Sequence, residues 1–168
     1  MIRALRRLFV AAAPHGFKWM AAFLLLSWGT TFLGARPVAA DETCDKWKQV
    51  ALSSVGLGQR LQAVDELRKV GGSSALVALE DVARTGDLKI ASAACAALGR
   101  AKSSSSKDVL KDLLEDTSLS TNVRITAASC IAVHWKDSGD ESYLDSKSEG
   151  NAALAAHVEV LKSKVYGE

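Results

Sequence analysis

The stretch IASAACAALG, residues 90–99, decides the fold of this chain of 168 residues. Small and branched apolar side chains follow one another almost without interruption, and a glycine ends the run. Alanine and leucine favour the α-helix, and a helix that is apolar nearly all round has to be buried. The stretch therefore predicts a central, buried helix against which the rest of the chain packs.

Two further stretches repeat the pattern, QRLQAVDEL at residues 59–67 and VRITAASCI at residues 123–131. The three copies start at residues 59, 90 and 123, and a recurring interval of this length is typical of a helical solenoid. Each copy contains a pair of small residues that lets neighbouring helices approach closely. These pairs are Ala63-Val64, Ala94-Cys95 and Ala127-Ala128.

Helical periodicity continues between the copies and predicts seven helices. Glycine-rich and serine-rich turns separate them, and we expect Ser74, Asp87, Ser106 and either Thr121 or Asn122 to cap helix N-termini. No segment alternates with a period of two, so the prediction is an all-α fold, with residues 136–150 as an acidic loop. The apolar stripes are Trp47, Val50, Ala51 and Val55; Leu61, Val64, Leu67 and Val70; Leu76, Leu79, Val82 and Ala83; residues 90–98; Leu110, Leu113 and Leu114; Val123, Ala127, Cys130, Ile131 and His134; and Leu154, Val158, Leu161 and Val165.

The three copies resemble the HEAT repeat in its bacterial HEAT-like form, whose second helix carries Val-Arg-x-x-Ala-Ala-x-Ala-Leu-Gly. The similarity covers about residues 44–135. This chain departs from the pattern at Gln59, at Ala91 in the arginine position, and at residues 132–133. The resemblance implies a short α-solenoid (α–α superhelix) of about three HEAT-like helix pairs plus a C-terminal closing helix, with the second helices lining a concave face. The implied pairs are 44–70, 74–99 and 106–135, and the closing helix is 150–165.

The first 40 residues predict an export signal. They contain five basic residues and no acid, and their apolar run, residues 19–33, is shorter than the roughly 20 residues of a bilayer span. Val38 and Ala40 suit a signal-peptidase site, which predicts cleavage after Ala40. We expect a signal peptide at 1–40 and a periplasmic or secreted repeat domain at 41–168. An uncleaved membrane anchor on a structural envelope protein stays open, as does twin-arginine export through Arg6-Arg7.

The charge of the chain comes from this leader. The whole sequence has 21 basic and 19 acidic residues, so removing the five leader cations leaves 16 against 19, a net charge of −3. A mildly acidic domain disfavours a nucleic-acid partner. We therefore expect no nucleic acid, and contact with a membrane only through the leader, if it stays uncleaved.

Cys44, Cys95 and Cys130 follow the leader, and an oxidising compartment would allow one disulfide among them. Cys95 and Cys130 lie in apolar helical runs, which favours two buried thiols and leaves a Cys95–Cys130 disulfide as the alternative. No Cys or His spacing typical of zinc occurs, so neither a metal nor a cofactor is expected.

The motifs predict a binding protein and not an enzyme. No catalytic pattern surrounds His134 or His157, and the acids of residues 137–145 lack the spacing of a calcium loop. A stack of repeats offers an extended surface that typically holds a protein partner. The residues expected on that surface are Arg60, Asp65, Arg68, Lys89, Ser92 and Arg124, with Trp135 as an aromatic anchor at one end.

The HEAT resemblance adds two alternatives. It implies that Arg60 and Arg124 form ion pairs with loop acids of adjacent repeats, for which Asp87 is a candidate, instead of contacting a partner. HEAT-like repeats also occur in bilin lyases, which implies an accessory subunit of an enzyme as the alternative function.

Overall fold

The computed structural model describes residues 38–167, apart from the side chains of Val38, Ala39 and Ser138. The chain divides at Val38, and the unit that follows, Ala39–Glu168, is described here by itself. The described residues form eight α-helices and a final π-helical turn, and none of them is in a strand. The elements are α3 Val38–Leu52, α4 Leu57–Val70, α5 Gly72–Thr85, α6 Leu88–Ala101, α7 Ser104–Glu115, α8 Thr121–Trp135, α9 Ser138–Ser148, α10 Ala152–Leu161 and η1 Lys162–Tyr166.

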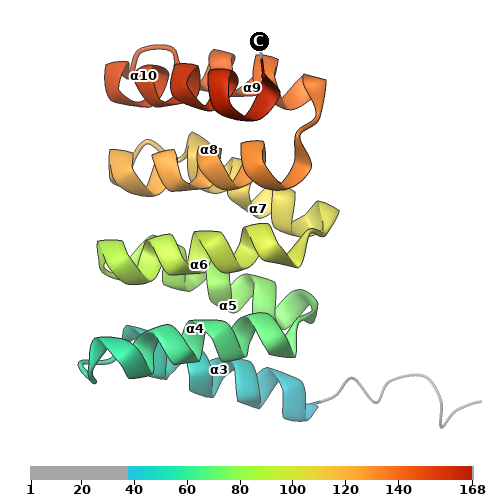
Figure 1. The fold of residues 1–168 in the computed structure, drawn as a ribbon. Helices are drawn as coiled ribbons and strands as arrows, with labels where there is room; N and C mark the ends of the chain where they lie inside the picture. The colour runs from blue at the N-terminus through green and yellow to red at the C-terminus, as the bar shows by residue number, and fades with distance from the viewer. Residues whose placement is uncertain (1–37, 168) are drawn as a thin grey trace, which may run out of the picture. The chain divides into compact units, whose positions relative to one another are not determined.

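Consecutive helices form pairs that stack on one another (Figure 1). The second helices α4, α6, α8 and α10 make one continuous row, in which each contacts the next. The first helices α3, α5, α7 and α9 form the layer behind this row. The predicted all-α solenoid of HEAT-like repeats is confirmed, and we call the exposed side of the row the second-helix face.

Small residues pack between the second helices, as the repeat predicts. Ala63, Ala94 and Ala127 are fully buried, and so are Ile90 and Leu98 of the central helix α6. Each of these side chains is covered only because the neighbouring pair lies against it. The repeat period in the sequence is therefore the period of the stack.

Gly99 marks the closest approach of α6 and α8. A Cβ atom added there would lie 2.5 Å from Cδ2 of His134 and 3.1 Å from Cβ of Cys130. Real Cβ atoms do not come this close to ring carbons, so the crossing of the two helices depends on a residue without a side chain.

The N-terminal caps agree with the sequence in part. Asp87 accepts hydrogen bonds from the backbone nitrogens of Lys89 and Ile90, both at 3.1 Å, as predicted. Ser103 caps α7 and Ser106 completes a reciprocal capping box with it, so the predicted cap lies three residues too late. Ser120 caps α8 in place of Thr121 or Asn122, and α5 begins at Gly72, before Ser74. Runs of serine and threonine offer several equivalent caps, which explains these shifts.

The predicted acidic loop at 136–150 is wrong, because most of it is helix α9. Leu144 is buried against the stack, and the Oδ1 atom of Asp140 lies 2.8 Å from Nζ of Lys107 on α7. The hydroxyl of Tyr143 donates to Glu115 at 2.9 Å. These contacts with α7 hold a helix that has almost no apolar stripe. The closing helix α10 therefore has a partner, and the described residues form four pairs.

The leader lies outside the described residues except for Val38, Ala39 and Ala40, which open α3. Cleavage after Ala40 stays a prediction. No helix within residues 38–167 has the length and the apolar character that crossing a membrane requires.

Candidate functional site

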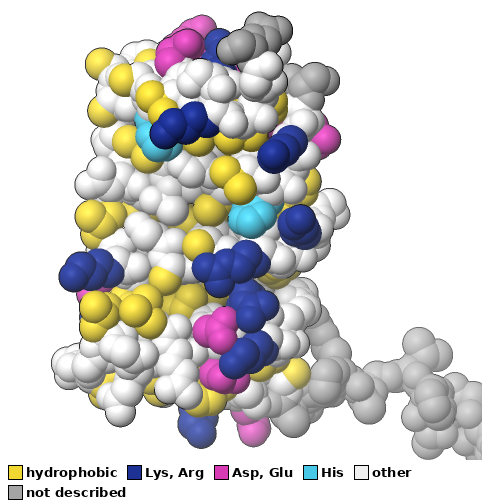
Figure 2. Space-filling view, in the orientation of Figure 1, with side chains coloured by type: hydrophobic (Ala, Val, Ile, Leu, Met, Phe, Trp, Pro, Cys, Tyr) yellow, Lys and Arg dark blue, Asp and Glu magenta, His cyan; other side chains and the backbone are white. Residues whose placement is uncertain are grey.

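The second-helix face carries side chains of different kinds at its two ends (Figure 2). Hydrophobic side chains gather where α4 and α6 begin, on the left of the view. Lys and Arg side chains gather where these helices end, on the right. Five of the seven residues predicted to contact a partner lie on this face, whereas Arg124 and Trp135 do not.

Three exposed leucines make up the apolar end, which we call the leucine patch: Leu57 and Leu61 of α4, and Leu88 of α6. Their exposed fractions are 40%, 39% and 46%. Leu57 and Leu88 line a surface cavity of about 470 Å³ together with Arg60, Asp87 and Lys89.

Sequence analysis placed Leu61 in the buried stripe and did not single out Leu57 or Leu88. Val55 and Val70, also predicted as stripe residues, are exposed as well. Leu57 and Leu61 are four residues apart and so lie on one side of α4. This spacing was the signal in the sequence that could have indicated an apolar surface.

Arg60 holds the wall of this cavity in place. Its Nε donates to the carbonyl oxygen of Ala51 at 2.8 Å, and its Nη1 lies 2.6 Å from Oδ2 of Asp87. The backbone N–H of Ile90 and the guanidinium of Arg60 both lower the pKa of the Asp87 carboxyl. The ion pair that the HEAT resemblance implied for Arg60 is thus present, and it joins α4 to the start of α6. The hydrogen bond to Ala51 joins α4 to the end of α3.

Arg124 also bonds the first helix of its pair, but the ion pair that the HEAT resemblance implied for it is not found among the described residues. Its Nε donates to the carbonyl oxygen of Leu114 at 2.8 Å, and the residue is only 9% exposed. A buried side chain cannot contact a partner, so the structure corrects the prediction of Arg124 as a surface residue. The second pair has Ala91 at this position, and there no arginine bonds the first helix.

Polar side chains in the middle of the face connect neighbouring second helices. The Oγ of Ser92 lies 3.4 Å from Oγ1 of Thr126, and the Oγ of Ser129 lies 2.7 Å from Nε2 of His157. Ser92 is half-buried, so its hydroxyl serves the contact between α6 and α8 before any partner.

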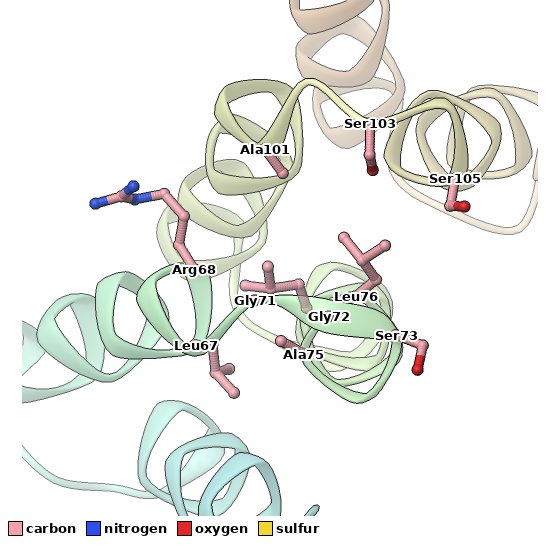
Figure 3. A pocket seen from close by; sticks show the side chains of 11 residues that line it. Leu67, Arg68, Gly71, Gly72, Ser73, Ala75, Leu76, Ala101, Ser103 and Ser105 are labelled. Atoms are coloured by element: carbon pink, nitrogen blue, oxygen red, sulfur yellow. The ribbon is translucent and has the colours of Figure 1, made fainter. Parts of the chain in front are cut away.

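A second cavity, of about 420 Å³, opens where α4 ends and α5 and α7 begin (Figure 3). Leu67, Ala75 and Leu76 supply its apolar lining, and Ser103 and Ser105 lie on its far side. Among its lining residues Arg68 alone is charged, and Figure 3 shows the guanidinium directed away from the cavity. The convergent polar groups that orient a small ligand are therefore missing from this lining.

Arg68 bonds its own helix. Its Nη2 lies 2.9 Å from Oδ1 of Asp65, and Lys69 also pairs with Asp65, at 3.0 Å. The side chains of Arg68 and Lys69 together lower the pKa of the Asp65 carboxyl. Asp65 and Arg68 are thus half-buried members of a local ion-pair cluster on α4, and their contact with a partner stays a prediction.

Trp135 lies at the end of α8 but faces the first-helix layer. The Nζ of Lys107, on α7, lies 5.8 Å from the centre of its ring system. The ring is half-buried against the core. The predicted aromatic anchor therefore packs between α7 and α8, and the structure gives it no place on the second-helix face.

The cysteines Cys44, Cys95 and Cys130 are buried, and the structure describes each as a free thiol. Burial raises the pKa of Cys95 to about 12 and that of Cys130 to about 11. The alternative of a Cys95–Cys130 disulfide stays a prediction. Within residues 38–167, no group of three or more His, Cys, Asp or Glu side chains is placed to hold a metal ion.

Comparison with known proteins supports the fold. The sequence matches no family model and none of the curated proteins. Among solved structures, it is similar to human deoxyhypusine hydroxylase, described in complex with glycerol, with a TM-score of 0.62 and 18% identity. The match covers 76% of this chain and 45% of that chain. The present chain thus corresponds to less than half of that protein, which is also built of HEAT repeats.

This match contradicts the prediction that the chain is not an enzyme, because the protein that shares its fold is one. The prediction relied on the lack of a catalytic motif in a stack of repeats, but a protein with this fold can be an enzyme. At 18% identity the likeness shows the fold alone and transfers neither activity nor substrate.

Proposed function

We propose that this protein is an exported binding protein that holds a protein partner on its second-helix face, with the leucine patch as the apolar centre of the contact. The observation that carries the proposal is the exposure of Leu57, Leu61 and Leu88 on two neighbouring helices, with Leu57 and Leu88 lining one surface cavity. Single exposed leucines are common on protein surfaces, whereas a contiguous group rimmed by charges is typical of an interaction site.

The surroundings of the patch suit a protein interface. Arg60, Asp87 and Lys89 form a charged rim around the cavity, and the hydrogen bonds of Arg60 hold that rim rigid before a partner arrives. Covering an exposed leucine fully is worth about 1.5–3 kcal/mol, so three half-exposed leucines supply enough for an energetic centre. A rigid surface also loses little conformational entropy on binding.

The leader supports export. Its basic start, apolar run and small residues before Asp41 are the features that signal peptidase recognises. Sequencing the N-terminus of the protein recovered outside the cytoplasm tests this part directly. We expect Asp41 as the first residue. An N-terminus at Met1 in the membrane fraction would contradict it.

The binding role is tested by capture from the native cell envelope, with mass spectrometry of what is retained. We expect a double variant, Leu57→Gln with Leu88→Gln, to lose the partner while its thermal midpoint stays unchanged. Val77→Gln is the matched control, because Val77 is 57% exposed on α5, in the first-helix layer. Equal capture by the double variant and the wild type would refute the leucine patch as the binding surface.

A subunit of an enzyme is the second candidate, which the likeness to deoxyhypusine hydroxylase favours. The same capture experiment distinguishes the two candidate functions. A retained enzyme whose activity changes when this protein is added would support the subunit role. A retained structural or transport protein would support the binding role.

A further inference from the structure

Three basic residues at the ends of α6 and α8 have no acidic neighbour among the described residues. Arg100, Lys102 and Lys136 are exposed, and no carboxylate within residues 38–167 lies within 4.0 Å of any of them. Most other basic side chains of the stack are paired. We call these three residues the basic ridge; they lie at the ends of α6 and α8, and Lys and Arg side chains gather at this end of the second-helix row in Figure 2.

Two residues of the ridge occupy a backbone conformation that lysine adopts at a cost. Lys102 and Lys136 follow directly on α6 and α8 with φ angles of 51° and 56°. In the first pair the equivalent position after α4 is Gly71, with φ 66°. Glycine takes this left-handed conformation freely, whereas a residue with a Cβ pays about 1 kcal/mol or more. The stack thus holds two lysines in the left-handed region, with ψ angles of 28° and 29°, whereas Gly71 combines its positive φ with a ψ of −169°, a conformation that is essentially restricted to glycine.

The ridge is compact because α6 and α8 end side by side. His134 of α8 touches Gly99 of α6, as described above. Burial lowers the pKa of His134, and the charges of Lys102 and Arg100 lower it further. The two cations at the end of α6 thus act on a histidine near the end of α8, which agrees with the close contact of the two helix ends.

Acidic residues bound the ridge on the side of α4. Asp65 and Glu66 bind Lys69 at 3.0 and 2.9 Å, and Asp65 also binds Arg68. The positive charge of Arg68 and Lys69 on α4 is thus compensated locally, whereas that of the ridge is not. Neighbouring helix axes are about 8–10 Å apart, and an extended peptide covers this distance in about three residues.

We infer that the basic ridge takes a short acidic segment of the protein partner, with carboxylates about three residues apart, one for each helix end. This inference rests on the proposed function, because it names the chemistry of the same partner. A nucleic acid or an anionic membrane presents negative charge over a wider area and would meet the acids of α4. A short peptide segment can place its few carboxylates on the ridge and avoid them.

An alternative reason for these lysines is local stability, because cations near a helix C-terminus interact favourably with its dipole. Glycine substitution separates the two explanations. If the lysines served stability, Lys102→Gly with Lys136→Gly would lower the thermal midpoint. If they serve binding, the double variant keeps or raises the midpoint, since the strain is removed, and loses affinity for acidic peptides.

The test measures fluorescence anisotropy of a labelled peptide, Glu-Gly-Ser-Glu-Gly-Ser-Glu, with the full protein at low ionic strength. The control peptide carries Gln in place of Glu. The control variant is Lys46→Gln with Lys111→Gln, which removes two charges from the first-helix layer. We expect the double glycine variant to bind the Glu peptide about fivefold more weakly or worse, the control variant to bind normally, and salt to weaken binding.

Three results would overturn the inference: no binding of the Glu peptide by the wild type, equal binding of the Gln peptide, or full binding by the double glycine variant. Wild-type binding to phosphatidylglycerol vesicles without peptide binding would assign the ridge to lipid and overturn it too. Envelope capture keeps the two proposals apart. Loss of the partner in the leucine variant alone would leave the proposed function standing and remove the ridge from it. Loss of the partner in the lysine variant alone would keep the ridge as a binding surface and refute the leucine patch.

Discussion

Replacing Arg124 with methionine tests how the pairs are held together. Methionine keeps most of the apolar stem of arginine but removes the Nε that donates to the carbonyl oxygen of Leu114 at 2.8 Å. That carbonyl lies in the last turn of α7, beside a side chain that is 91% covered. Losing a hydrogen bond from a charged donor to a buried acceptor costs about 1.5–3 kcal/mol.

We therefore expect Arg124→Met to lower the free energy of unfolding by about 2–3 kcal/mol. For a domain of this size, each kcal/mol shifts the thermal midpoint by about 3–5 °C, so the expected fall is about 6–15 °C. Urea titration followed by circular dichroism measures both the midpoint and the slope. The slope should stay constant, because the surface exposed on unfolding does not change.

Arg84→Met is the matched control. Arg84 bonds Glu80 at 2.9 Å and Asp116 at 2.5 Å, but its side chain is 30% exposed, so water can replace these partners. Surface ion pairs of this kind contribute up to about 1 kcal/mol. If both variants lost the same free energy of unfolding, the reasoning would be refuted, because burial of the bonded carbonyl would then not increase the cost of losing the hydrogen bond. A loss below about 0.5 kcal/mol for Arg124→Met would do the same.

Three further predictions concern the contact between α6 and α8. Gly99→Ala should destabilise by about 1–2 kcal/mol despite the better helix propensity of alanine, because its Cβ would meet His134 and Cys130. In a His134→Ala background the same change should destabilise less, because only the contact with Cβ of Cys130 at 3.1 Å remains, and a double-mutant cycle in urea measures the difference. Because its pKa is lowered from 6.5, His134 takes up its proton more readily in the unfolded chain. Stability should therefore fall as the pH drops below about 6.5, and His134→Gln should remove this part of the fall in urea titrations. The thiols of Cys95 and Cys130, with pKa values raised to about 12 and about 11, should resist iodoacetamide in the native protein and react fully in denaturant, which mass spectrometry counts. Fast native labelling would show that the two helices open readily.

The fold could be predicted well from the sequence because the features that specify each repeat lie within a few residues of one another. A small pair such as Ala94-Cys95 and a cap such as Asp87 are local features, and both are found where they were expected. Gly99, which was expected to end its helix, lies inside α6, because the helix continues to Ala101. Helix α9 was missed because Leu144 and Tyr143 are its only large apolar residues. Its stability comes from partners on α7, which lie about thirty residues away in the sequence. Periodicity cannot detect a helix that depends on such contacts.

The candidate site was harder to predict than the core. Periodicity separates the buried side of a helix from the exposed side, but it does not say which exposed residues find partners in the next repeat. The sequence pattern predicted a surface position for Arg124, which is buried, and a core position for Leu61, which is exposed. In both cases the deciding neighbour belongs to another helix, so only the assembled stack reveals the outcome.

The left-handed lysines also bear on how such a protein could be re-engineered. Lys102 and Lys136 sit at junctions where the chain leaves one unit and enters the next. A duplicated copy of residues 72–102, inserted after Lys102, would bring its own junction and with it second copies of the ridge cations Arg100 and Lys102. The acidic segment that the protein could bind would then be longer by the spacing of one helix pair for each added copy. The number of repeats would thus select for acidic segments of a given length.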